Sequence, residues 1–445
     1  MPLASLSTPA DIQTFLEQEE QKELLRFTTA GSVDDGKSTL IGRLLYDSKG
    51  VYEDQLSSVK KASINRSAGP IDFSLLTDGL KAEREQGITI DVAYRYFSTP
   101  KRKFIIADTP GHEQYTRNMA TGASTAELAI VLVDARKGVL QQSRRHAFIA
   151  SLLGIPNVVV AVNKMDLVEF RQDIFESIRS EFLHFARDLA IPNLYFIPIS
   201  ALDGDNVVEQ SPRTPWYSGG SLLNYLETVP LGTGVKWEDM RFPVQYVIRP
   251  TLDFRGYAGQ LASGVIRPGD PVMVLPSGRT SKVKSIVAFD GDLAEAHPPM
   301  SVTVCLEDEI DISRGDMLVS PSRMPHVSRR LESMIVWMHA DPMQVDKPYL
   351  LKHTTQQVRA TVTAVLNRID IHTLAKDEAA ELQLNEIGSV ALETHKPLFF
   401  DAYKENRATG SFILIDPVTN ATVAAGMIVT RAKEKRQNSS ALAGV

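Results

Sequence analysis

Residues 31–39 combine glycine, lysine and hydroxyl side chains at a spacing that could hold a phosphate group. Glycine lets the backbone curl tightly, so that its N–H groups can surround an anion at the start of a helix. Lys37 can then reach the β- and γ-phosphate oxygens of a nucleotide, and the Ser38 hydroxyl can ligate Mg²⁺. An ordinary glycine turn would need neither the apolar stretch before this loop nor the helical stretch after it. The expected nucleotide-binding residues are Gly31, Ser32, Val33, Asp34, Asp35, Gly36, Lys37, Ser38 and Thr39, with Lys37 also counted as catalytic.

A second motif could read the base of that nucleotide. Guanine presents an N1–H and a 2-amino group, and a carboxylate at Asp166 can accept from both, which adenine cannot match. The motif alone is a commonplace surface turn, but here it lies downstream of a phosphate loop, at a strand end where such sheets bind ligands. The expected guanine-binding residues are Asn163, Lys164, Met165 and Asp166, completed by a backbone contact from Ser200, Ala201 and Leu202.

A third motif follows another apolar run and could serve the γ-phosphate. Asp108 can hold a water molecule on Mg²⁺, and Gly111 leaves room for its N–H to approach the γ-phosphate. An isolated loop histidine is more often structural, but the Asp-x-x-Gly context favours a role for His112 in orienting the attacking water. The expected binding residues are Asp108, Thr109, Pro110, Gly111 and His112, with Gly111 and His112 also assigned to catalysis and Ser38 and Asp108 to the metal.

The elements that must position these motifs alternate between short apolar runs and amphipathic helical stretches. This alternation is typical of βαβ units, and it predicts a mostly parallel, doubly wound sheet. Each motif directly follows one of the expected strands, so the sheet would carry all three along the edge where its strands end. The expected strands are residues 25–30, 91–97, 103–108, 128–134, 158–163 and 194–200.

Beyond residue 240 the helical period fades, and short alternating segments separated by turns predict two small β-barrels. Expected strands include residues 244–249, 260–266, 272–275 and 301–306, then 333–338, 358–366, 389–393, 412–415 and 422–429. The fold class is therefore an α/β P-loop GTPase domain followed by two β-barrel domains. We expect an N-terminal helical extension at 1–24, the GTPase domain at 25–229, a linker at 230–240, barrels at 241–325 and 326–432, and a flexible tail at 433–445.

Composition narrows the class of protein further. The 445 residues are 43% apolar and 23% charged, as in an ordinary globular protein, and the net charge of −6 argues against nucleic-acid binding by bulk charge. The single cysteine, Cys305, permits no disulfide within the chain. No apolar run reaches the roughly 20 residues of a membrane span, and the acidic N-terminal stretch does not resemble a signal peptide. We expect a cytoplasmic protein with no membrane or nucleic-acid partner.

Residues 81–91 resemble the switch region of the translation-factor class of GTPases, which includes elongation factors Tu and 1-alpha. The resemblance implies that Thr89 is a catalytic switch residue that ligates Mg²⁺ in the GTP state, and that Val33 and Ile88 form an apolar gate beside His112. It also implies a GTPase domain followed by two barrels, in agreement with the breaks that composition indicates.

A closer resemblance is to the GTPase subunits of bacterial sulfate adenylyltransferase, also called ATP sulfurylase. It is carried by residues 27–38, 72–80, 111–120 and 249–259, while Ser32 replaces the histidine usual in elongation factors. The resemblance implies a hetero-oligomer in which GTP hydrolysis on this subunit drives adenylyl transfer from ATP to sulfate on a separate catalytic subunit. Some members continue into an adenylylsulfate kinase domain with a second P-loop. Because this sequence has no second such motif, we do not expect that activity in it.

Two other readings remain at this point. One is an elongation factor that delivers aminoacyl-tRNA, and the other is a GTP-dependent scaffold that hydrolyses GTP too slowly for turnover to matter. Binding of aminoacyl-tRNA would distinguish the first, and turnover with and without the partner would distinguish the second.

Overall fold

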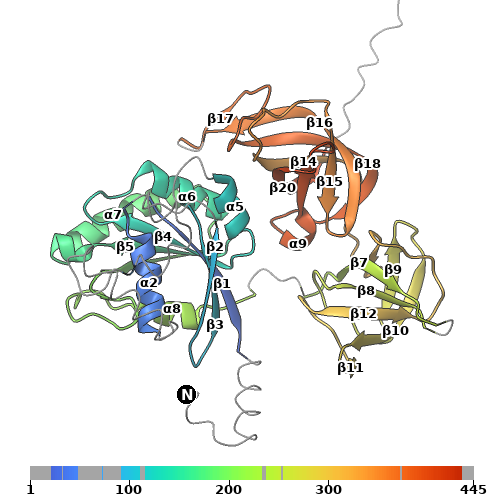
Figure 1. The fold of residues 1–445 in the computed structure, drawn as a ribbon, viewed down its shortest axis with the longest axis horizontal. Helices are drawn as coiled ribbons and strands as arrows, with labels where there is room; N and C mark the ends of the chain where they lie inside the picture. The colour runs from blue at the N-terminus through green and yellow to red at the C-terminus, as the bar shows by residue number, and fades with distance from the viewer. Residues whose placement is uncertain are drawn as a thin grey trace, which may run out of the picture. The chain divides into compact units, whose positions relative to one another are not determined.

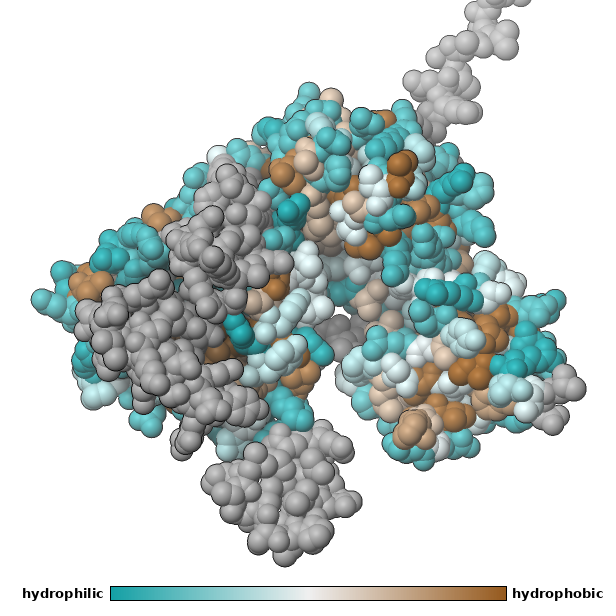
Figure 2. Space-filling view, in the orientation of Figure 1, coloured by the Kyte–Doolittle hydropathy of each residue, from teal (hydrophilic) through white to brown (hydrophobic). Residues whose placement is uncertain are grey.

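The computed structural model describes residues 22–32, 34–48, 73, 92–110, 116–232, 237–251, 254–370 and 373–432. The chain divides into two compact units, Met1–Thr233 and Gly234–Val445. Among the described residues, no helix is both long and apolar enough to span a membrane. Cys305 is a buried free thiol. On the face shown in Figure 2, apolar residues are interspersed with hydrophilic ones, as on ordinary globular surfaces.

The first unit is built on a six-stranded sheet in the order β2-β3-β1-β4-β5-β6 (Figure 1). All neighbouring strands run parallel except β2, which is antiparallel to β3. Every residue of β4 and β5 is buried, as expected for strands covered on both faces. The mostly parallel sheet is therefore confirmed. Its strands are β1 (Leu24–Ala30), β2 (Ala93–Ser98), β3 (Lys103–Asp108), β4 (Leu128–Asp134), β5 (Asn157–Asn163) and β6 (Asn193–Pro198).

A helix follows every strand of this sheet except β2, which is joined to β3 by residues 99–102. Apolar side chains of α2 and α8 join those of β1, β3 and β4 in one core cluster. The strand order reverses at β1, because β3 and β2 lie on one side of it and β4, β5 and β6 lie on the other. Open α/β sheets form their ligand crevice at such a reversal, beyond the carboxyl ends of the strands. The helical elements are α2 (Lys37–Asp47), α5 (Thr116–Ala123), α6 (Gln141–Leu152), η4 (Met165–Val168), α7 (Gln172–Ala186) and α8 (Leu222–Thr228).

The second unit holds two antiparallel sheets, and each closes on itself. In the first, the order β11-β10-β12-β8-β7-β13-β9 is closed by pairing of β9 with β10. In the second, the order β15-β19-β20-β14-β18-β16-β17 is closed by pairing of β15 with β16. Each barrel encloses its own apolar core. The two expected β-barrels are therefore confirmed.

The barrel strands are, in the first sheet, β7 (Arg241–Ile248), β8 (Gly256–Gln260), β9 (Pro271–Leu275), β10 (Thr280–Ala288), β11 (Gly291–Asp292), β12 (Ser301–Leu306) and β13 (Met317–Val319). Those of the second are β14 (His326–Trp337), β15 (Pro348–His353), β16 (Gln356–Ile369), β17 (Lys376–Asp377), β18 (Ile387–Phe400), β19 (Ser411–Ile415) and β20 (Thr422–Arg431), with the short helix α9 (Arg407–Gly410) before β19.

The strand predicted at residues 260–266 is wrong. The strand in this region is β8, and it ends at Gln260. Its glycines are required by close packing, because a β-carbon at Gly256 would lie 2.4 Å from Cγ2 of Thr303 and one at Gly259 would lie 2.4 Å from the Pro243 carbonyl oxygen. Residues without side chains give no alternating pattern, so the sequence concealed this strand.

Candidate functional site

The predicted motifs meet at the carboxyl edge of the parallel strands. The phosphate loop follows β1, the Asp108 motif ends β3, and the Asn163 motif ends β5. The strand register places Thr29 opposite Asp108, and Asp134 opposite Asn163. Because parallel strands end on the same edge, residues far apart in sequence are brought together there.

The phosphate loop is held in a tight curl by its own polar groups. The Ser32 N–H donates to Oδ2 of Asp35 at 2.7 Å, and the Asp35 N–H donates to the Ser32 carbonyl at 3.2 Å. Asp34 and Gly36 have positive φ angles of 70° and 92°. Helix α2 begins immediately afterwards at Lys37, so its first N–H groups lie at the end of the loop. Val33 lies outside the described residues.

Lys37 connects this loop to the end of β3. Its ammonium lies 2.8 Å from Oδ1 of Asp108 and donates to the Thr109 carbonyl. The Thr29 hydroxyl donates to the same Asp108 oxygen at 3.4 Å, and the Thr109 hydroxyl donates to the Thr29 carbonyl at 2.8 Å. Both charged groups are almost completely buried, so their attraction is weakly screened. The predicted cation and the predicted acidic residue are therefore neighbours.

The remaining members of the first and third motifs divide into two groups. Ser38 and Thr39 lie half-buried in the first turn of α2, and Pro110 is buried after Thr109. Gly111, His112 and Thr89 lie outside the described residues.

Asn163 joins the phosphate loop to the loop that follows β6. Its Nδ2 donates to the Asp35 carbonyl at 2.7 Å, and its Oδ1 accepts from the Ala201 N–H at 2.9 Å. Lys164 adds a second tie, because its ammonium donates to the Asp34 carbonyl. Asn163 and Lys164 thus hold the backbone of the phosphate loop, and Asn163 also holds the backbone of the loop after β6.

The other members of the base-reading set take different positions. Asp166 is half-buried in the first turn of η4. Met165 is completely buried, and its N–H donates to the Ile199 carbonyl at 3.2 Å, so its side chain anchors the turn in the core. The Ser200 hydroxyl accepts from the Asp203 N–H at 3.2 Å, while the Leu202 side chain is exposed.

Two Bacteroides proteins resemble the chain over most of its length. It is 59% identical over 430 residues to sulfate adenylyltransferase subunit 1 of Bacteroides fragilis, covering 96% of this chain and 90% of that protein. It is 60% identical over 437 residues to the subunit 1 of Bacteroides thetaiotaomicron, with the same coverage. The chain belongs to the sulfate adenylyltransferase subunit 1 family. The family resemblance inferred from the sequence is thereby confirmed.

Other matches agree with this family. A bifunctional enzyme CysN/CysC of Rhodopirellula baltica is 58% identical over 425 residues, covering 95% of this chain and 66% of that longer protein. Residues 22–233 match the elongation factor Tu GTP binding domain, and residues 330–429 match a GTP-eEF1A C-terminal domain-like family. An alignment with a solved structure of sup35 complexed with GDP covers 93% of this chain and 95% of the sup35 chain, at 23% identity and a TM-score of 0.43. At that score the likeness adds nothing to the assignment.

In this sulfate adenylyltransferase subunit 1 family member, sequence reasoning missed Asp134 at the end of β4. Its carboxylate accepts from Nη2 of Arg136 at 2.6 Å and lies 3.0 Å from the Lys164 ammonium. Burial raises the pKa of Asp134, but hydrogen bonds from Arg136 and Lys164 outweigh that effect and hold the pKa well below its ordinary value. Asp134 thus orients Lys164. Its position, an aspartate ending an apolar run as Asp108 does, was the signal that could have found it.

Two polar side-chain atoms in the described part of the loop between β1 and α2 are buried without a partner, and of these the Ser32 hydroxyl could donate to a phosphate. Among the described residues, the Ser32 hydroxyl and Oδ1 of Asp35 are buried without a hydrogen-bond partner. Burial raises the pKa of Asp35 to about 6, opposed by the hydrogen bond from the Ser32 N–H. In the described part of the chain, no three His, Cys, Asp or Glu residues cluster as a metal site. Ser38 and Asp108 carry oxygen atoms of the kind that Mg²⁺ prefers, and such an ion would take its other oxygens from phosphate and water.

Proposed function

We propose that this protein is the GTP-hydrolysing subunit of a sulfate adenylyltransferase. Its GTP hydrolysis drives formation of adenosine 5′-phosphosulfate and pyrophosphate from ATP and sulfate on a separate catalytic subunit, with which it forms a hetero-oligomer. The observation that carries this proposal is the assembly around Asn163, which ties a phosphate loop to a base loop in a chain whose relatives are named sulfate adenylyltransferase subunit 1.

Guanine is read from two sides in this proposal. The Asp166 carboxylate accepts hydrogen bonds from the N1–H and the 2-amino group of guanine. A backbone N–H of the loop formed by Ser200, Ala201 and Leu202 donates to the 6-oxo group, where adenine has an amino group that cannot accept. Lys164 supports both contacts, because its links to the Asp34 carbonyl and the Asp134 carboxylate hold the phosphate loop against the base motif.

Mg²⁺ supplies positive charge to the β- and γ-phosphate oxygens when it is bound. The Ser38 hydroxyl and, in the GTP state, the Thr89 hydroxyl would ligate it, and Asp108 would hold one of its waters. Asp108 also orients the Lys37 ammonium, which lies 2.8 Å away. Lys37 provides a fixed positive charge for the γ-phosphate as negative charge develops during hydrolysis.

The attacking water is oriented by His112 in this proposal, and the Gly111 N–H donates to the γ-phosphate. Val33 and Ile88 restrain His112 until the partner is present, so that hydrolysis is slow in the isolated subunit. A reaction that joins sulfate to the α-phosphate of ATP needs such coupling, because sulfate is a poor nucleophile and the resulting anhydride is high in free energy.

The test is to combine this protein with the catalytic subunit encoded by the same genome. Adenosine 5′-phosphosulfate and pyrophosphate are measured from ATP and sulfate with GTP, with GDP, and with a non-hydrolysable GTP analogue. We expect GTP to raise product accumulation and the other two to fail. Equal accumulation in all three would contradict coupling, and binding of aminoacyl-tRNA by this chain would favour an elongation factor instead.

A further inference from the structure

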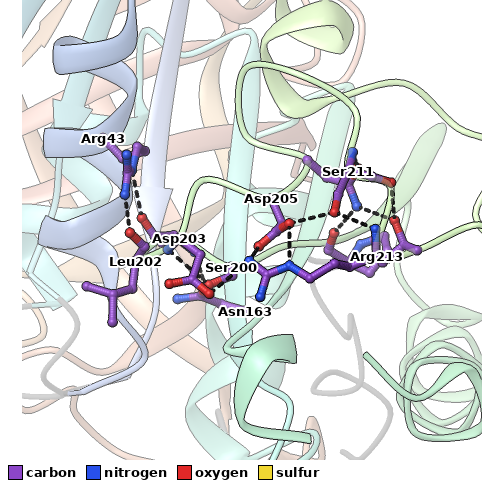
Figure 3. Close-up of polar contacts among 12 residues, drawn as sticks. Arg43, Asn163, Ser200, Leu202, Asp203, Asp205, Ser211 and Arg213 are labelled. Atoms are coloured by element: carbon purple, nitrogen blue, oxygen red, sulfur yellow. Dashed lines mark hydrogen bonds and ion pairs between the residues drawn. The ribbon is translucent and has the colours of Figure 1, made fainter. Parts of the chain in front are cut away.

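Arg43 of helix α2 donates two hydrogen bonds to the backbone of residues 200–205, the loop after β6, which we call the base loop. Its Nε donates to the Ala201 carbonyl at 3.2 Å, and its Nη2 donates to the Leu202 carbonyl. Figure 3 shows the guanidinium reaching from α2 to this loop, on which Leu202, Asp203 and Ser200 lie close to Asn163. A planar guanidinium can engage two successive carbonyls at once, which a lysine ammonium cannot do in a fixed geometry.

The two hydrogen bonds from Arg43 help to fix the orientation of the peptide groups in the base loop. The Ala201 N–H donates to Asn163, and the Asp203 N–H donates to the Ser200 hydroxyl. Because a trans peptide directs its carbonyl and its N–H to opposite sides, the hold on the Ala201 carbonyl turns the Leu202 N–H away from Arg43. Among the described residues, the Ala201, Asp203 and Gly204 N–H groups have acceptors within the protein and the Leu202 N–H has none, so the Leu202 N–H is free to donate to a ligand.

Arg43 is itself held in place on the helix surface. Its guanidinium lies 4.2 Å from the centroid of the Phe73 ring, and its Nη1 lies 3.7 Å from Oδ1 of Asp47 one turn later. Phe73 packs edge-on against Tyr46, with ring centroids 5.5 Å apart. These contacts restrict the rotamers of a side chain that would otherwise be mobile, so little entropy is lost when it binds the two carbonyls.

The far end of the loop is fixed by a different arginine. Nη2 of Arg213 lies 2.8 Å from Oδ2 of Asp203, and its Nε donates to Oδ1 of Asp205 at 3.0 Å (Figure 3). The guanidinium of Arg213 also covers the Phe170 ring at 4.5 Å. Loss of Arg43 would therefore release the Ala201 and Leu202 carbonyls, while the Ala201 N–H stays on Asn163 and residues 203–205 stay anchored.

We propose that Arg43 is a positioning residue for base selection, which aims the Leu202 N–H at the 6-oxo group of guanine. This inference rests on the proposed guanine site. Arg43 does not touch the nucleotide in this scheme; it acts through the carbonyls of Ala201 and Leu202. Because it lies on the helix that begins at the phosphate loop, it also couples the position of that loop to the position of the base.

The test compares three diphosphates that differ at one edge of the base. GDP carries the 6-oxo group, 6-thio-GDP replaces it with a sulfur that accepts hydrogen bonds weakly, and IDP keeps it but lacks the 2-amino group. Dissociation constants are measured by calorimetry for wild type, Arg43→Met and Arg43→Lys. We expect Arg43→Met to weaken GDP about tenfold, the scale of one lost hydrogen bond. Binding of 6-thio-GDP should change by less than about threefold, and the GDP to IDP ratio should be preserved.

Arg43→Lys keeps the positive charge but cannot donate to both carbonyls in a fixed geometry. It should therefore shift the ratio of the GDP and 6-thio-GDP affinities in the same direction. If the methionine variant does not fold, Arg43→Lys alone still tests the proposal.

Arg179→Met on α7 is the matched control, because Arg179 makes only an exposed ion pair with Glu176 among the described residues. All three affinities should stay unchanged in this control. Equal weakening of all three nucleotides by the Arg43 variants, or an unchanged GDP to 6-thio-GDP ratio, would overturn the proposal. Wild type that prefers ADP to GDP would instead reject the guanine site itself.

Discussion

A β-carbon placed on Gly36 would lie 2.4 Å from Nδ2 of Asn163. The phosphate loop and the Asn163 motif are therefore in direct contact, although 127 positions separate these two residues. The contact leaves Asn163 able to donate to the Asp35 carbonyl at 2.7 Å. The positive φ of Gly36 adds a second reason for glycine, since other residues are strained there.

We predict that Gly36→Ala displaces Asn163 and breaks the tie between the two loops. GDP binds the wild-type geometry of the loop in the proposed site, and restoring that geometry in the variant should cost about 2 kcal/mol or more for backbone strain and the displaced hydrogen bond. That cost is about a 30-fold loss in GDP affinity. Gly138→Ala is the control, because Gly138 has a φ of 71° but nothing within 4 Å of an added β-carbon. It should lower thermal stability while GDP affinity stays unchanged. Equal losses of affinity in both variants would show that strain alone is responsible.

Asp35 gives the phosphate loop a dependence on pH. Burial raises its pKa from 3.8 to about 6 in the folded protein. The folded state therefore binds more protons than the unfolded state between about pH 4 and pH 6, so stability falls as pH rises through that window and is level above it. A shift of roughly two units corresponds to about 3 kcal/mol.

Asp35→Asn should remove this dependence, because the amide is neutral and its oxygen can still accept from the Ser32 N–H. The free energy of unfolding of the nucleotide-free protein, measured from pH 4.5 to 7.5, should fall less steeply in the variant than in wild type. The variant should be the more stable protein at pH 7.5. Asp173→Asn is the control, since Asp173 is exposed and its pKa is lowered by Arg171. Parallel pH profiles for wild type and Asp35→Asn would refute the assignment.

The sheet and the phosphate loop could be predicted because their signals are local. β4 and β5 are continuous apolar runs, and the glycine, lysine and serine spacing lies within a few positions. The contact from Arg43 to Ala201 joins residues 158 positions apart, and in the sequence Arg43 looks like any charged residue on an amphipathic helix. Only the fold shows that its guanidinium turns toward the base loop. Strand β8 was misplaced for the related reason that its glycines carry no side-chain pattern.

Asp166→Asn should change which base the protein prefers. An amide can donate to the 2-oxo group of xanthine, whereas the carboxylate accepts from the 2-amino group of guanine. We expect GTP to bind about 10² or more less tightly and xanthosine triphosphate to bind better than it does to wild type. Competition binding with both nucleotides measures this, and Asp188→Asn on the exposed surface of the same unit serves as the control. Unchanged base preference would remove guanine readout from Asp166.

The last prediction concerns His112 and the coupling of hydrolysis to sulfate activation. Phosphoryl transfer is catalysed mostly by positioning and charge, so a residue that orients water should affect turnover far more than binding. His112 lies four positions after Asp108 in the sequence, and Asp108 is fixed beside Lys37. The segment that carries His112 therefore follows a carboxylate that is held against the lysine of the phosphate loop.

His112→Ala should keep GTP affinity within a few-fold and lose roughly 10² or more in hydrolysis rate, the scale of a positioned catalytic group. GTP-driven formation of adenosine 5′-phosphosulfate should fall in parallel, because the free energy of hydrolysis reaches the partner only when hydrolysis occurs. Both rates are measured on the complex of each variant with the same catalytic subunit, with His184→Ala on α7 as the control histidine. Full GTPase activity in His112→Ala would reject the role of His112, whereas lost hydrolysis with undiminished product accumulation would reject the coupling.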